Sequence, residues 1–141
     1  MMTLSDLLGL PSAPSNGLAW HDLLQAGLPR ASLEVLATHL NVEVADLIGV
    51  LGVRHNEELL TSGESDQLYR VALALRQSMI VSRGSLSKAV QWLKTPNPNI
   101  RGRVPLGLVS SYMGAEFVLT ALERLKPTPK ELAEKPEESE E

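Results

Sequence analysis

The side chains that could carry out chemistry in this chain are few and widely separated. The histidines His21, His39 and His55 share no helical spacing that would bring two of them to one metal ion. Cysteine is absent, which excludes disulfides and thiolate ligands. No glycine-rich phosphate loop follows a strand-like segment, and the acidic residues fall on expected helix surfaces, where carboxylates are usually just solvated. We therefore expect a protein that is not an enzyme, with no catalytic residue, metal or cofactor.

Basic residues are concentrated in the middle of the chain. Residues 70–103 hold seven basic residues and no acidic one, whereas residues 1–69 hold two basic and nine acidic residues. Residues 104–141 hold four basic and eight acidic residues. A continuous basic segment indicates an anionic partner or an acidic protein surface. The alternative, equally open here, is a solvated face whose arginines pair with the acidic first half.

Apolar residues recur at helical spacing along most of the chain, and sustained β-branched alternation is absent. This pattern predicts an all-α fold with helical segments at about 33–40, 42–52, 54–60, 62–83, 86–94 and 112–125. In the long segment we expect five residues to face inward: Leu68, Val71, Ala72, Leu75 and Met79. In the last segment the expected buried stripe is Phe117, Val118, Ala121, Leu122 and Leu125.

The second and third segments have the lengths of a helix-turn-helix, but their charge disagrees with DNA binding. The segment in the recognition position, "VRHNEELLTSG", has one arginine and two adjacent glutamates, Glu57 and Glu58, which a phosphate backbone repels. A structural or dimerising role is therefore favoured. If these helices do contact DNA, the plausible phosphate partners are Arg54, Arg70, Arg76 and Arg83. Arg76 and Arg83 are seven residues apart and would share one face of the long helix.

The two ends of the chain differ in composition from the helical part. Residues 1–18 read as a flexible segment with a short apolar head. Residues 126–141 hold three prolines and six glutamates, which predicts a disordered acidic tail. No apolar run approaches the roughly 20 residues of a membrane span, and the first residues lack the basic start of a secretory signal. We expect a cytoplasmic protein without a membrane partner.

An elaborate turn, "QWLKTPNPNIRGRVPLGLV" over residues 91–109, separates two helical segments. Its prolines pre-set the backbone, so the turn is expected to be ordered before any partner arrives. Arg101 and Arg103 flank Gly102, and at least one of them should be available to a partner. Arg103 could instead clamp a carbonyl of the turn, and Trp92 could be a core residue or an interface anchor.

Residues 27–125 resemble the Xre/MbcA/ParS-type antitoxins of RES–Xre toxin–antitoxin systems. "GESDQLYRVALAL" is similar to a Glu-Ser-Asp segment of that family followed by an arginine, here at Glu64, Ser65, Asp66 and Arg70. Residues 89–125 are similar to its C-terminal toxin-binding domain. The matching positions are Trp92, Leu93, Pro96, Asn97, Gly102, Arg103, Pro105, Leu106, Gly114, Leu122, Arg124 and Leu125.

The resemblance implies an antitoxin that binds a RES-domain, NAD-degrading toxin, occludes its active site and also represses its own operon. It implies a helix-turn-helix-like domain over 19–84, a toxin-binding domain over 85–125, and a homodimer within a hetero-oligomeric complex. The recognition segment and the added acidic tail depart from the family pattern. The candidate toxin contacts are Arg101, Arg103, Tyr112, Met113, Glu116, Arg124, Leu125 and Lys126. The alternative is a DNA-binding transcriptional regulator that has no toxin partner.

Overall fold

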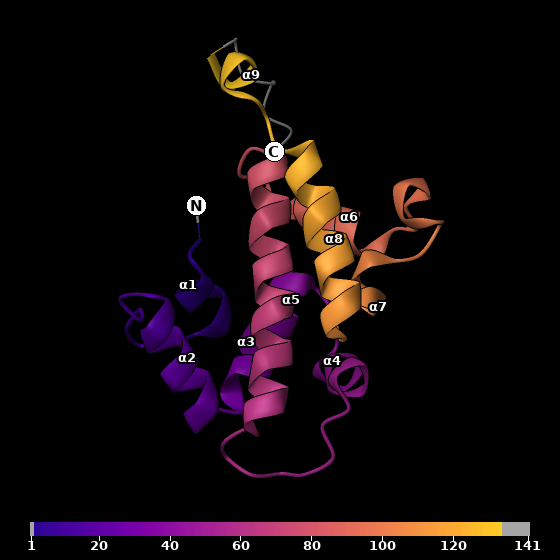
Figure 1. Ribbon diagram of the computed structural model, residues 1–141. Helices are drawn as coiled ribbons and strands as arrows, with labels where there is room; N and C mark the ends of the chain where they lie inside the picture. Colours follow the sequence, from indigo (N-terminus) through magenta and orange to yellow (C-terminus); the bar gives the residue numbers. More distant parts are fainter. Residues whose placement is uncertain (1, 134–141) are drawn as a thin grey trace.

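The computed structural model describes residues 2–133, and every regular element in this range is a helix, as predicted (Figure 1). Within this range no helix combines the length and the apolar composition needed to cross a bilayer. The elements are α1 (Leu4–Leu8), α2 (Gly17–Ala26), α3 (Ala31–Leu40), α4 (Val44–Leu51), α5 (Ser62–Val81), α6 (Leu86–Lys94), the 3-10 helix η1 (Pro98–Ile100), α7 (Pro105–Leu108), α8 (Tyr112–Leu125) and α9 (Pro129–Ala133).

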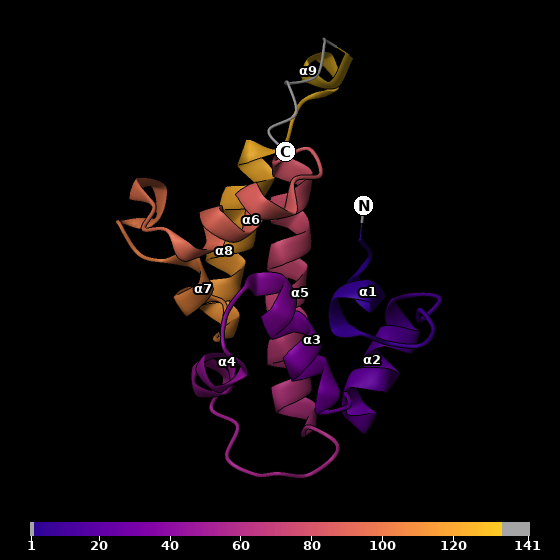
Figure 2. The same ribbon diagram turned by 180° about the vertical axis from the view of Figure 1, so that it is seen from behind.

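Helix α5 stands at the centre, with α1, α2 and α3 packed on one side and α6 and α8 on another (Figures 1 and 2). The five side chains predicted to face inward from it are all buried. Ala74 and Ser78 are buried as well, and the Ser78 hydroxyl donates to the Ala74 carbonyl at 2.8 Å. Because α5 is covered on more than one side, a single hydrophobic core runs from α1 to α8.

Helix α5 begins and ends at well-defined caps. The Glu64 N–H donates to the Thr61 hydroxyl at 3.1 Å, and the Thr61 N–H donates to the Glu64 carboxylate at 2.9 Å. This reciprocal pair is a capping box. The helix ends at Val81, because Arg83 and Gly84 have φ values of +55° and +93° and the Gly84 N–H turns back to the Met79 carbonyl. Arg83 therefore lies beyond the helix, and the prediction that it shares a helix face with Arg76 is wrong.

The start of the chain differs from the flexible segment expected over residues 1–18. Residues 4–8 form α1, which is held by a capping box at Thr3. Leu7 and Leu8 are fully buried, and the Ser32 hydroxyl of α3 donates to the Leu8 carbonyl at 2.6 Å. The apolar head thus contributes to the core through contacts with α3 and α5, which a local composition argument does not detect.

Residues 52–60 have no helical structure, although a third short helix was predicted over residues 54–60. The backbone of this segment pairs instead with residues 28–30. The Arg30 N–H donates to the Glu58 carbonyl at 2.7 Å, and the Leu60 N–H donates to the Leu28 carbonyl at 2.9 Å. In a helix over residues 54–60 the Leu60 N–H would donate to the Asn56 carbonyl instead, so the tertiary pairing overrides the apolar pattern.

The Glu-Ser-Asp segment and the following arginine stabilise the N-terminal half. Glu64 caps α5 and also contacts His55 Nε2 at 2.7 Å. The buried Ser65 hydroxyl accepts the Leu28 N–H at 2.7 Å. Asp66 and Arg70 form an ion pair one turn apart on α5. Glu64 therefore joins the loop 52–60 to α5 and Ser65 joins the 28–30 segment to it, while Asp66 and Arg70 pair within the helix.

The expected division at residue 84 does not separate two cores. Helices α6 and α8 both pack on α5, which belongs to the first of the two expected domains. The Lys94 ammonium also donates to the Leu40 carbonyl at 3.3 Å and to the Asn41 carbonyl at 3.0 Å, at the C-terminus of α3. The two halves are therefore joined by apolar packing and by a charged helix cap.

The expected disordered tail begins with ordered structure. Thr128 and Glu131 exchange hydrogen bonds at the start of α9, where the Thr128 N–H donates to the Glu131 carboxylate at 2.7 Å. These bonds, with a smaller attraction from Arg83, lower the pKa of Glu131. The prediction of disorder for residues 134–141 lies outside the described residues.

Helices α7 and α8 meet at Gly114, where the backbones approach closely. The Gly114 N–H donates to the Ser111 hydroxyl at 3.0 Å, which caps α8. A Cβ atom at residue 114 would lie 1.9 Å from the Leu108 carbonyl oxygen. Only glycine fits here without moving the first turn of α8 away from α7.

We predict that Gly114→Ala lowers the free energy of unfolding by about 1–3 kcal/mol, because the added methyl group overlaps backbone. Gly49→Ala is the matched control, since residue 49 lies inside α4 with open space around it. That control should raise stability by about 0.5–1 kcal/mol. Urea unfolding followed by circular dichroism measures both, and equal effects of the two substitutions would contradict the close approach.

We also predict an acid-sensitive contribution from Glu64. Partial burial alone would raise its pKa, but hydrogen bonds from the Thr61 N–H and the His55 ring outweigh burial and lower the pKa below 4.5. A lowered folded-state pKa stabilises the protein above the unfolded value, and this stabilisation is lost as the pH falls through the folded value. Glu64→Gln should therefore flatten the loss of stability below about pH 5.

Urea unfolding between pH 3 and pH 7 measures this dependence. Glu57→Gln is the control, because the Glu57 carboxylate makes no hydrogen bond or ion pair to residues 2–133. If the free energy of unfolding falls with pH as steeply in Glu64→Gln as in the parent protein, Glu64 does not have this role.

A candidate protein-binding surface on helix α8

Helix α8 carries apolar residues on two different faces. Its inner face, formed by Ala115, Val118 and Leu122, is buried against the rest of the core. A second row of apolar residues lies at intervals of four along the outer face. We call this row the outer stripe; it consists of Met113, Phe117, Ala121 and Leu125.

The large side chains of the outer stripe are exposed to solvent. The exposed fractions are 74% for Met113, 55% for Phe117 and 42% for Leu125. At a rise of about 1.5 Å per residue, the stripe extends for about 18 Å along the helix. The prediction that Phe117 and Leu125 belong to the buried stripe is therefore wrong. That expected stripe spanned more than one face of the helix, and only its members Val118 and Leu122 are fully buried.

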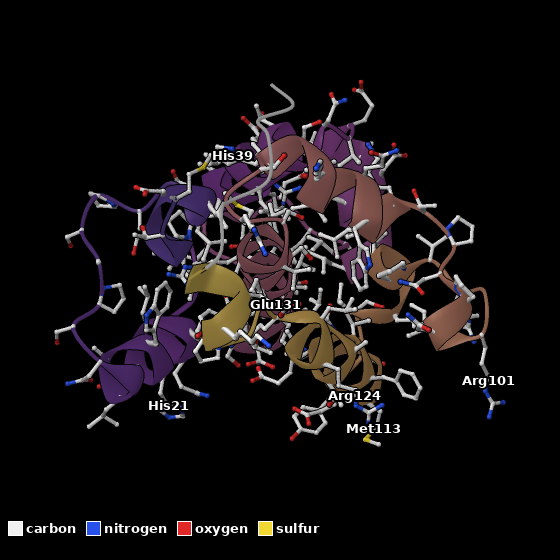
Figure 3. The ribbon with its side chains drawn as sticks, turned by 90° about the horizontal axis from the view of Figure 1, so that it is seen from above. His21, His39, Arg101, Met113, Arg124 and Glu131 are labelled. Carbon is white, nitrogen blue, oxygen red and sulfur yellow. The ribbon has the colours of Figure 1, made fainter. Side chains whose placement is uncertain are left out.

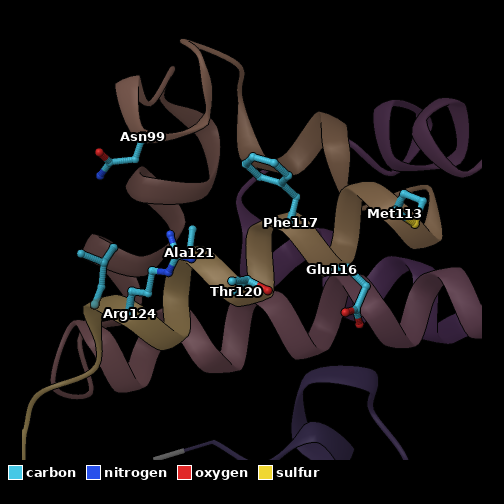
Figure 4. A pocket seen from close by; sticks show the side chains of 8 residues that line it. Asn99, Met113, Glu116, Phe117, Thr120, Ala121 and Arg124 are labelled. Carbon is cyan, nitrogen blue, oxygen red and sulfur yellow. The ribbon is translucent and has the colours of Figure 1, made fainter.

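A row of polar side chains runs beside the outer stripe. We call it the polar row; it consists of Glu116, Thr120 and Arg124, again four residues apart and all exposed. The two rows together line a surface pocket of about 530 Å³, which Asn99 of η1 closes on one side (Figure 4). The pocket therefore has an apolar floor with one acidic and one basic side chain along its edge.

Backbone hydrogen bonds hold the turn between α6 and α7 in place beside this pocket. The Asn97 N–H donates to the Arg103 carbonyl at 3.0 Å, and the Gly102 N–H donates to the Asn97 carbonyl at 2.8 Å. The Asn97 side chain accepts the Asn99 N–H at 2.8 Å. Ile100 is buried against α8. Asn97 thus makes several of the hydrogen bonds of this turn, a role that the composition of the turn alone did not single out.

The structure brings four of the eight predicted toxin contacts to the pocket: Met113, Glu116, Arg124 and Leu125. Arg101 is exposed in the left-handed conformation and points away from α8 (Figure 3). Arg103 is exposed and joins the turn through its backbone: its carbonyl accepts from Asn97, and its N–H donates to the Ile100 carbonyl at 3.2 Å. A side-chain clamp by Arg103 is absent among the described residues. Tyr112 is exposed but lies outside the pocket, and Lys126 pairs with Glu123 at 3.2 Å.

Four pocket residues were missed by sequence reasoning. Phe117 and Ala121 were assigned to the core, and Asn99 and Thr120 were not singled out. The available signal was the row of apolar residues at intervals of four from Met113 to Leu125. Together with Val118 and Leu122, this row occupies too much of the helix circumference for all of its members to be buried. Trp92 is half-buried against the core, so it does not stand free as an anchor.

The four predicted DNA contacts differ in burial and lie on different parts of the chain. Arg70 is largely buried and paired with Asp66. Arg54 lies in the irregular 52–60 segment, Arg76 is half-buried on α5, and Arg83 lies past the end of that helix. Among residues 2–133, no group of three potential ligands is arranged for a metal ion.

Comparison with protein families gives a match in the C-terminal part of the chain. No curated protein matches the chain. Residues 79–126 match the family model described as "Antitoxin Xre/MbcA/ParS C-terminal toxin-binding domain". This range begins in the last turn of α5 and ends at Lys126, and it contains the whole outer stripe and polar row. The C-terminal part of this chain is thus similar to the toxin-binding domain of Xre/MbcA/ParS antitoxins, which supports an antitoxin role with a toxin protein as partner.

Proposed function

We propose that this chain is an antitoxin whose partner is a RES-domain, NAD-degrading toxin, and that it inactivates the toxin by covering its active site. The chain itself has no enzymatic role in this proposal. The toxin-binding match over residues 79–126 supports the antitoxin part. The assignment to a RES-domain toxin rests on the sequence resemblance of residues 27–125.

The observation that carries the proposal is the outer stripe. Exposed apolar side chains are common singly, but a continuous row on one helix face is typical of binding surfaces. A helix that presents anchors at intervals of three or four residues commonly lies in a groove of its partner. Phe117, at the centre of the stripe, is the type of large residue that often dominates the affinity of such a contact.

The C-terminal end of α8 is the part that we place nearest the toxin's active site. Arg124, Leu125 and Lys126 lie together there, beside the pocket. Arg124 is exposed and makes no ion pair among residues 2–133, so it can form a charge-assisted hydrogen bond with a partner.

Repression of the antitoxin's own operon is a secondary part of the proposal. The irregular, acidic 52–60 segment and the paired Arg70 weigh against a recognition helix of the usual kind. Arg54, Arg76 and Arg83 remain as phosphate contacts for weak binding that a toxin complex would strengthen. Tight operator binding by the free protein, steeply weakened by salt, would instead favour a regulator without a toxin.

We predict that Phe117→Asp weakens toxin binding at least thirtyfold, because a charge replaces the central apolar anchor. The matched control is Leu18→Asp, since Leu18 is an equally prominent apolar side chain, 70% exposed on α2. Calorimetric titration with a RES-domain toxin measures affinity, and NAD consumption measures inhibition. Both variants should keep the helical spectrum and thermal midpoint of the parent.

A Phe117→Asp variant that binds as tightly as the parent would exclude α8 as the contact. Loss of binding by Leu18→Asp would place the contact on the N-terminal half instead.

We predict that a chain ending at Lys126 keeps its toxin affinity within about twofold and keeps full inhibition. The physical reason is that no residue lining the pocket belongs to residues 127–131, the part of the tail whose side chains the structure describes. The same titration and NAD assay test it. Loss of inhibition with a smaller loss of binding would mean instead that the glutamate-rich tail enters the NAD site and competes for its basic groups.

A further inference from the structure

The connection between α6 and α7 projects from the body of the molecule. We call it the projecting turn; it consists of residues 95–104, between the end of α6 and the start of α7, and contains η1. In both ribbon views it extends beyond α6 and α8, on the side opposite α1 and α2 (Figures 1 and 2). Ile100 is buried against α8, whereas the tip, residues 101–103, is exposed. A partner can therefore reach the tip without any rearrangement of the fold.

The surface is hollowed on two sides of the projecting turn. On the α8 side lies the pocket described above, which Asn99 closes. On the α6 side lies a second hollow of about 490 Å³, whose lining includes Trp92, Pro96 and Pro98. Asn99 lines both hollows, so η1 forms the wall between them. A partner that encloses the turn can therefore place apolar groups on both sides of it.

Hydrogen bonds within the projecting turn fix its shape. The Ile100 and Gly102 N–H groups both donate to the Asn97 carbonyl, at 3.0 Å and 2.8 Å. The Arg101 N–H donates to the Pro98 carbonyl at 3.2 Å. A partner therefore binds the turn without the entropic cost of ordering its backbone.

Two arginines form the tip of the projecting turn. Arg101 and Arg103 are exposed, and neither side chain makes an ion pair with residues 2–133. Arg101 has a φ value of +60°, a conformation that favours glycine. Stability alone would therefore favour glycine at residue 101, and an arginine held at a conformational cost points to a role for its side chain.

We propose that the projecting turn enters a cleft of the toxin, whose walls fill both hollows and whose floor presents carboxylates to Arg101 and Arg103. This inference rests on the proposed function and adds a second contact to that of the outer stripe. Guanidinium groups bind carboxylates through paired, charge-assisted hydrogen bonds.

A protein cleft fits the projecting turn better than nucleic acid does. Phosphates would also attract the two arginines, but the hollows beside the turn are lined by Trp92, Phe117 and prolines, which suit apolar protein walls. Both hollows also lie within residues 79–126, the range that matches a toxin-binding domain.

Arg101→Gly tests the contact, because it removes the guanidinium group and relieves the backbone at the same time. Toxin affinity should fall about tenfold. The thermal midpoint should stay at or above that of the parent, since glycine adopts this φ without strain. Calorimetric titration of the full chain with a RES-domain toxin measures affinity, and scanning calorimetry measures the midpoint.

Arg83→Gly is the matched control. Arg83 is also exposed, has a φ value of +55° and precedes a glycine, but it lies in neither hollow. This substitution should leave toxin affinity within about twofold of the parent. An equal loss of affinity in the two variants would overturn the inference. An Arg101→Gly variant that loses DNA binding but keeps its toxin affinity would assign the turn to nucleic acid instead.

The hollow on the α6 side has its own readout, because the chain contains two tryptophans, Trp20 and Trp92. With fluorotryptophan in the full chain and unlabelled toxin, the fluorine NMR signal of Trp92 should shift on binding. The signal of Trp20, on α2, should not, and Trp20→Phe assigns the two signals. A Trp92 signal that saturating toxin leaves unchanged would overturn the two-sided contact.

This inference and the proposed function fail in different ways. A parent chain that binds no RES-domain toxin would overturn the antitoxin function and this inference with it. A parent that binds and inhibits the toxin, with an Arg101→Gly variant of equal affinity, would overturn this inference alone.

Discussion

Helix α5 loses contact with water along most of its length, because α1, α2 and α3 cover one side of it and α6 and α8 cover another. Its small residues Ala72 and Ala74 let neighbouring helices approach closely, and Leu68, Val71 and Leu75 fill the space between them. The position of every functional side chain depends on this packing. Helix α8 packs on α5 through its inner face. Because this packing alone holds the helix on the core, its outer face can stay exposed.

The regular part of the fold could be predicted from the sequence where apolar spacing and burial coincide. The all-α class, the inward residues of α5 and the bounds of α6 and α8 follow from helical periodicity and from caps such as Ser85 and Ser111. The errors arose where long-range contacts decide the structure. Residues 52–60 look helical locally but pair with residues 28–30, and the apolar head of α1 is buried by helices distant in sequence.

The candidate site could be predicted only in part, again because contacts distant in sequence decide which residues are buried. Exposed residues such as Met113 and Glu116 could be named, because they fall outside the stripe that was expected to be buried. Phe117 could not, since an apolar residue on an amphipathic helix is normally assigned to the core. Deciding which of two apolar rows faces α5 requires the tertiary packing. The Asn97-centred turn, which closes the pocket with Asn99, likewise depends on backbone hydrogen bonds that composition does not specify.

The inner and outer faces of α8 share no side chain, and this separation has a consequence for how the protein can change over generations. Substitutions in the outer stripe and polar row alter what the helix recognises, while Ala115, Val118 and Leu122 continue to hold it on the core. Partner choice can therefore drift without loss of the folded state. A duplicated copy of such a chain could acquire a new partner through a few surface substitutions and no longer bind the partner of the original chain.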